Sequence, residues 1–263
     1  MKSKVRDLVE FMEQWAPLSY AESYDNPGLL LGRLDKSIET VMVAVDASEA
    51  VVQQALQQQA DCLITHHPLI FHPIKRVTDE DRTGRRLLTL AEHGIALYSA
   101  HTNLDTAPGG NNDYAAALLG LEKVRAVARP GEQACLRLGQ LPAPLSLEAL
   151  GKLVKEQFFL PYLRLIGEAQ QEVSRVALCT GSGMDFMSLA LEEAADVLIT
   201  GDIGYHEAEE AKAKGLALID ASHFGTDRLS VKWTVQTLQQ WAQETGRALR
   251  IYAAEEPAID WIR

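Results

Sequence analysis

The segment ADCLIT at residues 60–65 recurs as ADVLIT at residues 195–200. In both copies a short apolar run follows a helical pattern and stops where polar residues begin, which is typical of a buried strand after a helix. Two longer segments also match, because GIALYSAHTNLD (94–105) and GLALIDASHFGTD (215–227) both end in His-x-x-x-Asp. A single match could come from any buried strand, whereas two correlated matches indicate an internal repeat.

Short apolar runs rich in Val, Ile and Leu alternate with helical patterns along the chain. The predicted strands are VMVAV (41–45), CLIT (62–65), IALYSA (95–100), VSRVALCT (173–180), DVLIT (196–200) and LALIDAS (216–222). This alternation predicts βαβ units, in which a largely parallel sheet is covered by helices. The expected fold class is therefore α/β, with two similar lobes and a ligand crevice between them.

The two lobes are expected to be discontinuous in sequence. A break near ARPGEQ (128–133) separates the two series of predicted strands. We expect the terminal helix 228–244 and the strand ALRIYAA (248–254) to pack back on the first lobe. The first lobe then comprises residues 1–127 and 228–263, and the second comprises residues 128–227.

The composition excludes some classes of protein. The chain has 263 residues with a formal net charge of -11 and a pI near 5.1, which argues against nucleic acid as the main partner. No signal-peptide segment or long uncharged run is present in the sequence, so a cytoplasmic protein without membrane contact is expected. Cys62, Cys135 and Cys179 stand singly in apolar segments, which predicts small buried residues in a reducing compartment.

Histidines and aspartates follow the predicted strands at the ends where parallel α/β sheets bind ligands. They are His66 and His67 after CLIT, His101 and Asp105 after IALYSA, and His223 and Asp227 after LALIDAS. One histidine at a strand end is more often structural than a ligand. Several histidines and aspartates at equivalent ends favour a metal site, because imidazole and carboxylate groups suit zinc, iron, manganese and similar divalent ions.

The adjacent pair His66 and His67 precedes Pro68, which keeps His67 out of the helical region. Neighbouring residues of an extended chain point to opposite faces, so the two imidazoles are not expected to chelate one ion. Two ions about 3.5–4 Å apart, one at each histidine and bridged by a carboxylate, would use both side chains. The alternative is that one histidine binds a metal while the other caps or packs.

Four motifs in a fixed order resemble those of a known family. They are DNPGLLLG (25–32), ITHHPLIF (64–71), YSAHTNLD (98–105) and SHFGTD (222–227). The chain is similar here to the NIF-three-like family, whose members are also called GTP cyclohydrolase type 2 homologues. The resemblance implies two similar α/β lobes, two divalent metal ions in a dinuclear site between them, and a toroidal homohexamer.

The resemblance also implies a set of metal ligands. By motif they are His66, His67, Asp105 and His223, with His101 close to the site. The family usually has a glutamate four residues after the last histidine, where it bridges the two ions, and this chain has Asp227 instead. A shorter carboxylate must draw the ions closer or bind just one of them. Alternatively, Thr226 or Asp227 could be the N-cap of the helix that follows.

Other polar residues are weaker candidates. Asp46 could line the crevice, but we expect it to cap the helix that begins near Ser48. The turn Gly181-Ser-Gly183 opens a predicted helix whose amides could hold an anion, although a lone turn of this kind is usually only a tight turn. His206 lies among acidic residues and is more typical of a solvated helix face. His72 and His93 are expected at the surface.

The residues favour metal-assisted hydrolysis, with His101 moving a proton. The resemblance implies ring opening of a purine nucleotide such as GTP. The alternative is a metalloprotein without catalytic activity, which stores or senses metal or acts as a scaffold ring for partner proteins. A ring that threads nucleic acid is disfavoured by the acidic composition.

Overall fold

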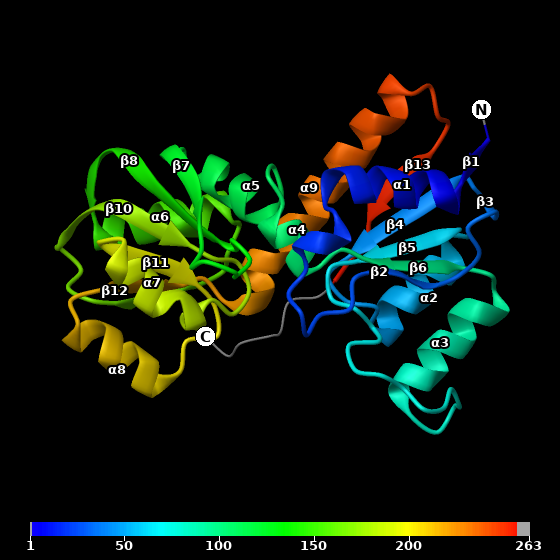
Figure 1. Cartoon of the computed structure of the whole chain (residues 1–263), viewed down its shortest axis with the longest axis horizontal. Coiled ribbons are helices and arrows are strands. Elements are labelled where there is room, and N and C mark those ends of the chain that lie inside the picture. Colours follow the sequence, from blue (N-terminus) through cyan, green and yellow to red (C-terminus); the bar gives the residue numbers. More distant parts are fainter. Residues whose placement is uncertain (1, 257–263) are drawn as a thin grey trace. The chain divides into compact units, whose positions relative to one another are not determined.

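The computed structural model describes residues 2–256. The chain divides into two compact units, Met1–Ala107 with Ser230–Arg263 and Pro108–Leu229. Both units combine sheets with covering helices (Figure 1), so the expected α/β class with two lobes is confirmed.

The first unit contains a mixed sheet of strand order β13-β4-β5-β6-β2. Its strands are β2 (Gly28–Leu31), β4 (Thr40–Ala44), β5 (Cys62–Thr65), β6 (Ala96–Ser99) and β13 (Arg250–Ala253), and a small ladder pairs β1 (Ser3–Lys4) with β3 (Ser37–Ile38). Its helices are α1 (Val5–Trp15), α2 (Glu49–Gln57), α3 (Arg82–Glu92) and α4 (Thr102–Thr106), with a 3₁₀ turn at Leu18–Tyr20. Helix α1 covers one face of the sheet, and α2 and α3 cover the other (Figure 1).

The second unit contains a sheet of strand order β7-β8-β10-β11-β12-β9. Its strands are β7 (Glu122–Val127), β8 (Leu136–Ser146), β9 (Arg164–Ile166), β10 (Glu172–Leu178), β11 (Val197–Thr200) and β12 (Ala217–Asp220). Its helices are α5 (Asn111–Leu118), α6 (Leu147–Gln157), α7 (Met187–Glu192) and α8 (Tyr205–Ala213), with a 3₁₀ turn at Met184–Phe186. Helix α9 (His223–Glu244) begins in this unit and ends in the first.

The first boundary between the units follows from strand pairing. The sequence pattern groups residues 108–127 with the first lobe, but in the structure this segment forms α5 and β7. Strand β7 pairs antiparallel with β8, and α5 contacts β8 as well. The edge strand of the second sheet therefore comes from residues that precede the break near residue 128.

The two units repeat one arrangement of strands. Parallel strands β4, β5 and β6 correspond to β10, β11 and β12, and an earlier strand of the same sheet, β2 or β9, pairs antiparallel with the third strand of each series. The aspartate of each ADxLIT copy also has the same partners. Asp61 accepts hydrogen bonds from the amides of Glu39 and Thr40, and Asp196 accepts them from the amides of Ser174 and Arg175. Each carboxylate thus holds the neighbouring parallel strand, Asp61 at the first residue of β4 and Asp196 within β10.

The central strands are buried on both faces, as expected where helices cover a parallel sheet. Every residue of β4, β5, β6 and β11 is buried. Side chains of the second sheet alternate between two cores, so that Val176 packs toward α5 and α6 whereas Ala177 packs toward α7 and α8. The three cysteines are buried free thiols, as predicted.

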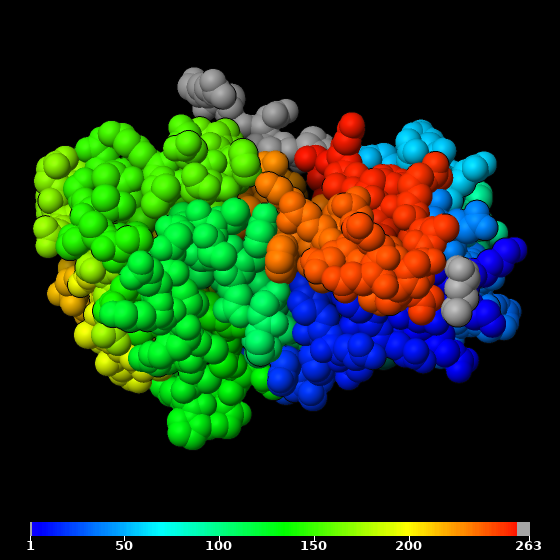
Figure 2. Space-filling view, turned by 90° about the horizontal axis from the view of Figure 1, so that it is seen from above, coloured from blue at the N-terminus to red at the C-terminus, as the bar shows by residue number. Residues whose placement is uncertain are grey.

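The C-terminal part of the first unit packs against its N-terminal part. Strand β13 pairs in parallel with β4, which extends the sheet. The Phe11 ring of α1 stacks on the Trp241 ring of α9 with centroids 4.8 Å apart. In the space-filling view the orange and red residues lie beside the blue N-terminal segment (Figure 2). Within residues 2–256, no helix combines the length and apolar character needed to cross a lipid bilayer.

Candidate metal site

The ends of β5 and β6 bring three histidines of the first unit together. His66 and His67 follow β5, and His101 follows β6. One ring nitrogen of each lies within 4.8 Å of the others. Nε2 of His66 is also 3.6 Å from Oδ2 of Asp105, which lies on α4 one turn after His101. The first unit alone therefore offers three imidazoles and a carboxylate to a cation.

His66 and His67 do not point to opposite faces, contrary to the expectation for an extended chain. Their ring centroids are 5.2 Å apart. The chain bends at these two residues immediately after β5 ends, so the alternation of a strand no longer applies. The bend is held by the side chain of Thr65, whose hydroxyl donates to the carbonyl of His67 at 2.8 Å. Both imidazoles can consequently approach the same ion.

Each of these histidines is anchored through Nδ1. His66 donates to the carbonyl of Ala100 at 2.8 Å, and His67 donates to Oδ1 of Asp46 at 3.0 Å. His101 donates to Oδ1 of Asp25 at 2.8 Å. Carbonyl and carboxylate oxygens accept hydrogen bonds, so each Nδ1 carries a proton and Nε2 is the nitrogen that has the lone pair in the neutral ring. Histidines that bind metals are oriented by partners of this kind.

Asp25 holds His101 from a fully buried position, since its side chain has 0% exposure. Besides His101, it accepts hydrogen bonds from the amide of Asn26 and from both the amide and the hydroxyl of Thr102, the last at 2.5 Å. Burial acts to raise the pKa of this carboxyl, but the hydrogen bonds from His101 and Thr102 outweigh it and lower the pKa to about 2. Asp25 is therefore an anion at neutral pH.

The turn that contains Asp25 also contacts the loop after His67. The side chain of Asn26 donates to the carbonyl of Ile70 at 2.6 Å. The segment DNPG thus ties together the loops that carry His67 and His101. The motif is visible in the sequence, but its partners lie 44 and 76 residues away, which explains why the local pattern did not single out Asp25.

The second unit contributes a histidine and an aspartate at the start of α9. His223 and Asp227 are four residues apart, so they share one face of the helix. Nε2 of His223 is 3.0 Å from Oδ2 of Asp227, and its Nδ1 donates to Oδ2 of Asp202 at 2.6 Å. The hydrogen bond with Asp227 raises the pKa of His223 to about 9 against the opposing effect of burial, with Asp202 adding to the rise. His223 is therefore a cation at neutral pH when no metal competes for Nε2.

The N-cap of α9 is neither Thr226 nor Asp227, the two residues offered as alternatives from the sequence. The helix begins at His223, so Thr226 and Asp227 lie inside it. The residue before it, Ser222, accepts a hydrogen bond from the amide of Gly225 at 3.0 Å. Asp227 is consequently not an N-cap, and its buried carboxylate faces His223.

The expected cap of α2 is also wrong. Ser48 is the N-cap, because its hydroxyl accepts a hydrogen bond from the amide of Val51 at 3.2 Å. The carboxylate of Asp46 is instead bonded to His67. A serine two residues further along the chain serves as the cap and leaves Asp46 to orient the imidazole.

Both glycine amides of the turn Gly181-Ser-Gly183 donate hydrogen bonds to side chains of the protein. The amide of Gly181 donates to the hydroxyl of Thr226 at 2.8 Å, and that of Gly183 donates to the hydroxyl of Thr200 at 2.7 Å. These amides are already engaged, which weakens the anion-binding alternative. A Cβ on Gly181 would lie 3.2 Å from a carboxylate oxygen of Asp227. The turn therefore allows the backbone to approach Asp227 closely.

The remaining histidines lie outside these groups. The side chain of His206 is 92% exposed and 3.9 Å from Glu209 on the same helix. His72 and His93 are exposed as well. All three histidines lie at the surface, as expected from the sequence.

The donor atoms available fit a divalent transition metal. Imidazole nitrogen and carboxylate oxygen suit zinc, iron or manganese, and tautomers fixed by acceptors at Nδ1 leave Nε2 ready to ligate. The cysteine sulfur atoms are not counted among the candidate metal ligands, since Cys62, Cys135 and Cys179 are buried in the apolar interior.

We expect metal binding to His223 to depend on pH. A metal ion must displace the proton from Nε2, whose pKa is raised from 6.5 to about 9. The apparent zinc affinity should therefore rise about tenfold per pH unit up to that pKa and level off above it. Zinc titrations between pH 6.5 and 9 test this, with Asp202→Asn as a control that should shift the plateau to lower pH. An affinity independent of pH over this range would contradict the prediction.

A family model described as Duf34/NIF3 (NGG1p interacting factor 3) matches residues 3–257 of the chain. The chain is also similar to two proteins named GTP cyclohydrolase 1 type 2 homolog. The one from Clostridium acetobutylicum is 34% identical over 235 residues, which cover 88% of each chain. The one from Streptococcus pneumoniae is 34% identical over 254 residues, which cover 95% of each chain.

Solved structures with similar folds include those of two further proteins. The Staphylococcus aureus hypothetical protein SA1388 matches with a TM-score of 0.91 and 26% identity, and the match covers 100% of both chains. Reduced HcgD from Methanocaldococcus jannaschii matches with a TM-score of 0.83 and 30% identity, and the match covers 96% of this chain and 98% of that one.

Proposed function

The chain belongs to the Duf34/NIF3 (NGG1p interacting factor 3) family, and on that premise we propose that it is a metal-dependent hydrolase with a dinuclear site. The observation that supports this most is the common anchoring of four histidines through Nδ1, which orients Nε2 of each as the ring nitrogen that a metal ion would bind once any proton on it is displaced. A structural histidine needs no such arrangement, whereas a metal ligand does.

The proposed ligands are His66, His67 and Asp105 from the first unit and His223 and Asp227 from the second. Divalent ions bound by these residues would supply hydroxide near neutral pH and polarise the atom under attack. Asp46 and Asp202 hold His67 and His223 in the orientation that ligation requires.

His101 is the proposed proton carrier. Its Nδ1 is occupied by Asp25, so a proton taken from water or substrate would go to Nε2. The buried carboxylate of Asp25 would then stabilise the imidazolium that forms. The ring of His101 lies 5.1 Å from that of His66 and 5.4 Å from that of His67, centroid to centroid, which keeps the carrier beside the proposed ligands.

A purine nucleotide is the proposed substrate class, with ring opening of GTP as the specific reaction. The support for this is the name that the relatives from Clostridium acetobutylicum and Streptococcus pneumoniae carry. The homohexamer is proposed on the family resemblance alone. Light scattering coupled to gel filtration tests it directly.

Metal content is the first test of the proposal. Untagged protein purified without chelator should contain about two divalent ions per chain by elemental analysis. His67→Ala and Asp227→Ala should each lower the content by at least one ion because each removes a ligand. His206→Ala is the matched control, since this exposed histidine contributes to neither group. Equal metal content in all four proteins would rule out the proposed ligands.

The alternative function is a metalloprotein that stores, senses or delivers metal without catalysis. The four anchored histidines support that function equally well, so turnover must decide. Metal-loaded protein is assayed with GTP and a panel of nucleotides and phosphoesters, beside His101→Ala. If the protein is a hydrolase, the variant should retain its metal and lose about 10²–10⁴-fold in rate. Metal binding without turnover of any substrate in the panel favours the alternative.

A further inference from the structure

An open cavity lies on the second unit, on strands β7, β8 and β10. It has a volume of about 230 Å³ and is lined by Lys123, Arg125, Leu138, Gly139, Gln140 and Arg175. Pockets for drug-sized ligands usually measure about 300–1,000 Å³, so this one suits a smaller group. Half of the lining residues are cations, in a chain whose formal net charge is -11.

The cations of the cavity are only partly neutralised. Glu193, at the end of α7, pairs closely with Arg125 and also contacts Arg175, at 3.4 Å. That long contact is the single hydrogen bond of the Arg175 side chain within the described part of the chain, and its Nε is buried without an acceptor there. Lys123 has no ion-pair partner among residues 2–256. Positive charge therefore exceeds negative charge around the cavity.

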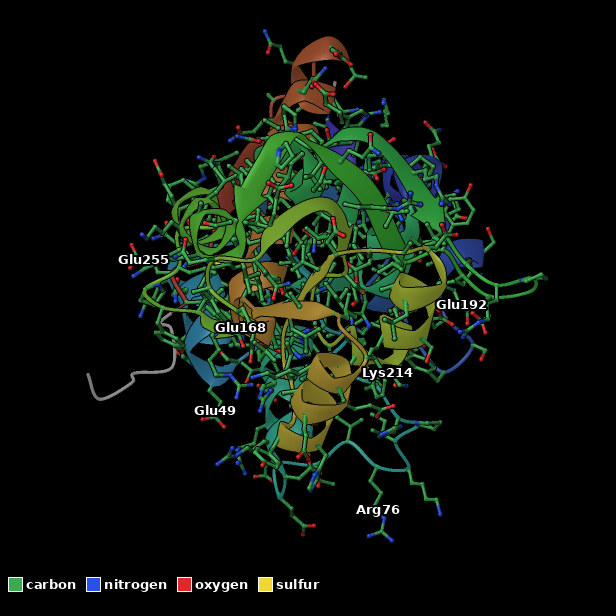
Figure 3. All side chains as sticks on the ribbon, turned by 90° about the vertical axis from the view of Figure 1, so that its left-hand side faces the viewer. Glu49, Arg76, Glu168, Glu192, Lys214 and Glu255 are labelled. Carbon is green, nitrogen blue, oxygen red and sulfur yellow. The ribbon has the colours of Figure 1, made fainter. Side chains whose placement is uncertain are left out.

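Two acidic side chains near the cavity, Glu192 and Asp196, are engaged elsewhere. Glu192 lies on the surface of α7 (Figure 3) and pairs with Arg129 at 2.8 Å. The carboxylate of Asp196 accepts hydrogen bonds from the backbone amides of Ser174 and Arg175. Neither carboxylate makes a hydrogen bond or ion pair with the side chain of Lys123 or Arg175. An anion that entered the cavity would consequently meet donors whose charge is not yet satisfied.

A β-bulge places Lys123 at this cavity. Glu122 pairs with Gln140 and Arg125 pairs with Leu138, so Lys123 and Val124 together oppose Gly139. Lys123 has a φ of +52°, a conformation that side chains other than glycine seldom adopt and that costs about 1 kcal/mol. Bulges redirect side chains and are common beside binding sites. The bulge accounts for the unusual φ of Lys123 and places this residue among those that line the cavity.

We propose that this cavity binds a phosphate group, either as free phosphate or as part of a small phosphorylated molecule. The guanidinium of Arg175, which has only a long contact with Glu193 among the described residues, presents forked donors that match the oxygens of a tetrahedral anion. Lys123 adds a mobile cation, and Arg125 adds a cation that it shares with Glu193. The competing explanation is structural. Cations on an edge strand such as β7 prevent this strand from pairing with a strand of another molecule. Cations near the C-terminal end of a helix also interact favourably with the carbonyl groups there.

Calorimetric titration of the full-length protein with inorganic phosphate and with phenyl phosphate tests the proposal. Metal is first removed with a chelator, because phosphate would otherwise bind metal ions as well. Binding of either ligand is expected at low ionic strength, and it should weaken as salt is added. Tighter binding of phenyl phosphate would identify a phosphorylated molecule as the ligand, whereas equal affinities would identify the free ion.

Two variants and a control locate the binding. Arg175→Gln should weaken binding about tenfold, as expected for the loss of one charge-assisted hydrogen bond. Lys123→Gly should weaken it similarly without lowering the melting temperature, because glycine suits the positive φ. Lys152→Gln on α6 is the matched control, since it removes a cation of the same unit outside the cavity. The proposal is overturned if neither ligand binds, if all three variants bind alike, or if Lys123→Gly self-associates with unchanged phosphate affinity.

Discussion

Asp25→Asn is expected to reduce the turnover of the proposed hydrolase by a factor on the order of 10⁴, the effect seen when an aspartate that orients a catalytic histidine becomes an asparagine. The asparagine amide would donate to Nδ1 of His101, where the carboxylate now accepts. The proton of the neutral imidazole would then move to Nε2. His101 could no longer accept a proton there, although its position would hardly change.

The tautomer can be measured even if no substrate is found. In metal-free protein, the ¹⁵N chemical shifts of the His101 ring should report a proton on Nδ1 in the native chain and on Nε2 in Asp25→Asn. Thr102→Val is the matched control, because it removes one hydrogen bond to Asp25 but leaves the bond to His101 in place. A native chain with the proton on Nε2 would refute the role of Asp25, whatever the turnover.

Gly201→Ala is expected to destabilise the second unit by about 3 kcal/mol and to lower metal binding. A Cβ at this position would lie 2.4 Å from the amide nitrogen of His223 and 2.8 Å from the carbonyl oxygen of Gly181. Both are backbone atoms, so no side-chain rotation relieves the collision. The start of α9 would have to move, and His223 and Asp227 would move with it.

Urea unfolding of the metal-free variant and elemental analysis of the purified variant measure the two effects. Gly204→Ala is the control, because its Cβ would meet only the flexible carboxylate of Glu207, at 2.8 Å. It should lose less than 1 kcal/mol and keep its metal. Native stability and native metal content in Gly201→Ala would show that the approach of His223 to this glycine is not required.

The sequence predicted each parallel strand of the two series to within two residues at either end, because these strands depend on local pattern and on the repeat. ADCLIT contains β5, which pairs in parallel with β4, and ADVLIT contains β11, which pairs in parallel with β12. His66, His67 and His101 lie together because carboxyl ends of adjacent parallel strands meet at one edge of a sheet. Periodicity and chain order were sufficient for this part of the site.

The direction of each side chain was decided by tertiary structure. A bend after β5 turns His66 and His67 toward each other, which the alternation of an extended strand does not predict. Caps were misassigned for a similar reason, since several polar residues near a helix start compete for the same amides and only the folded backbone selects among them.

The sequence by itself determined the α/β class, the repeat, and which histidines and aspartates follow neighbouring strands. Tertiary structure alone decided that Asp25 orients His101 and Asp46 orients His67, and that Lys123 faces a cavity from a bulge. The physical reason is that strand and helix patterns arise from neighbours within a few residues, whereas these contacts join atoms separated by 21 and 76 residues of chain. Such contacts form only once the sheet has brought the loops together.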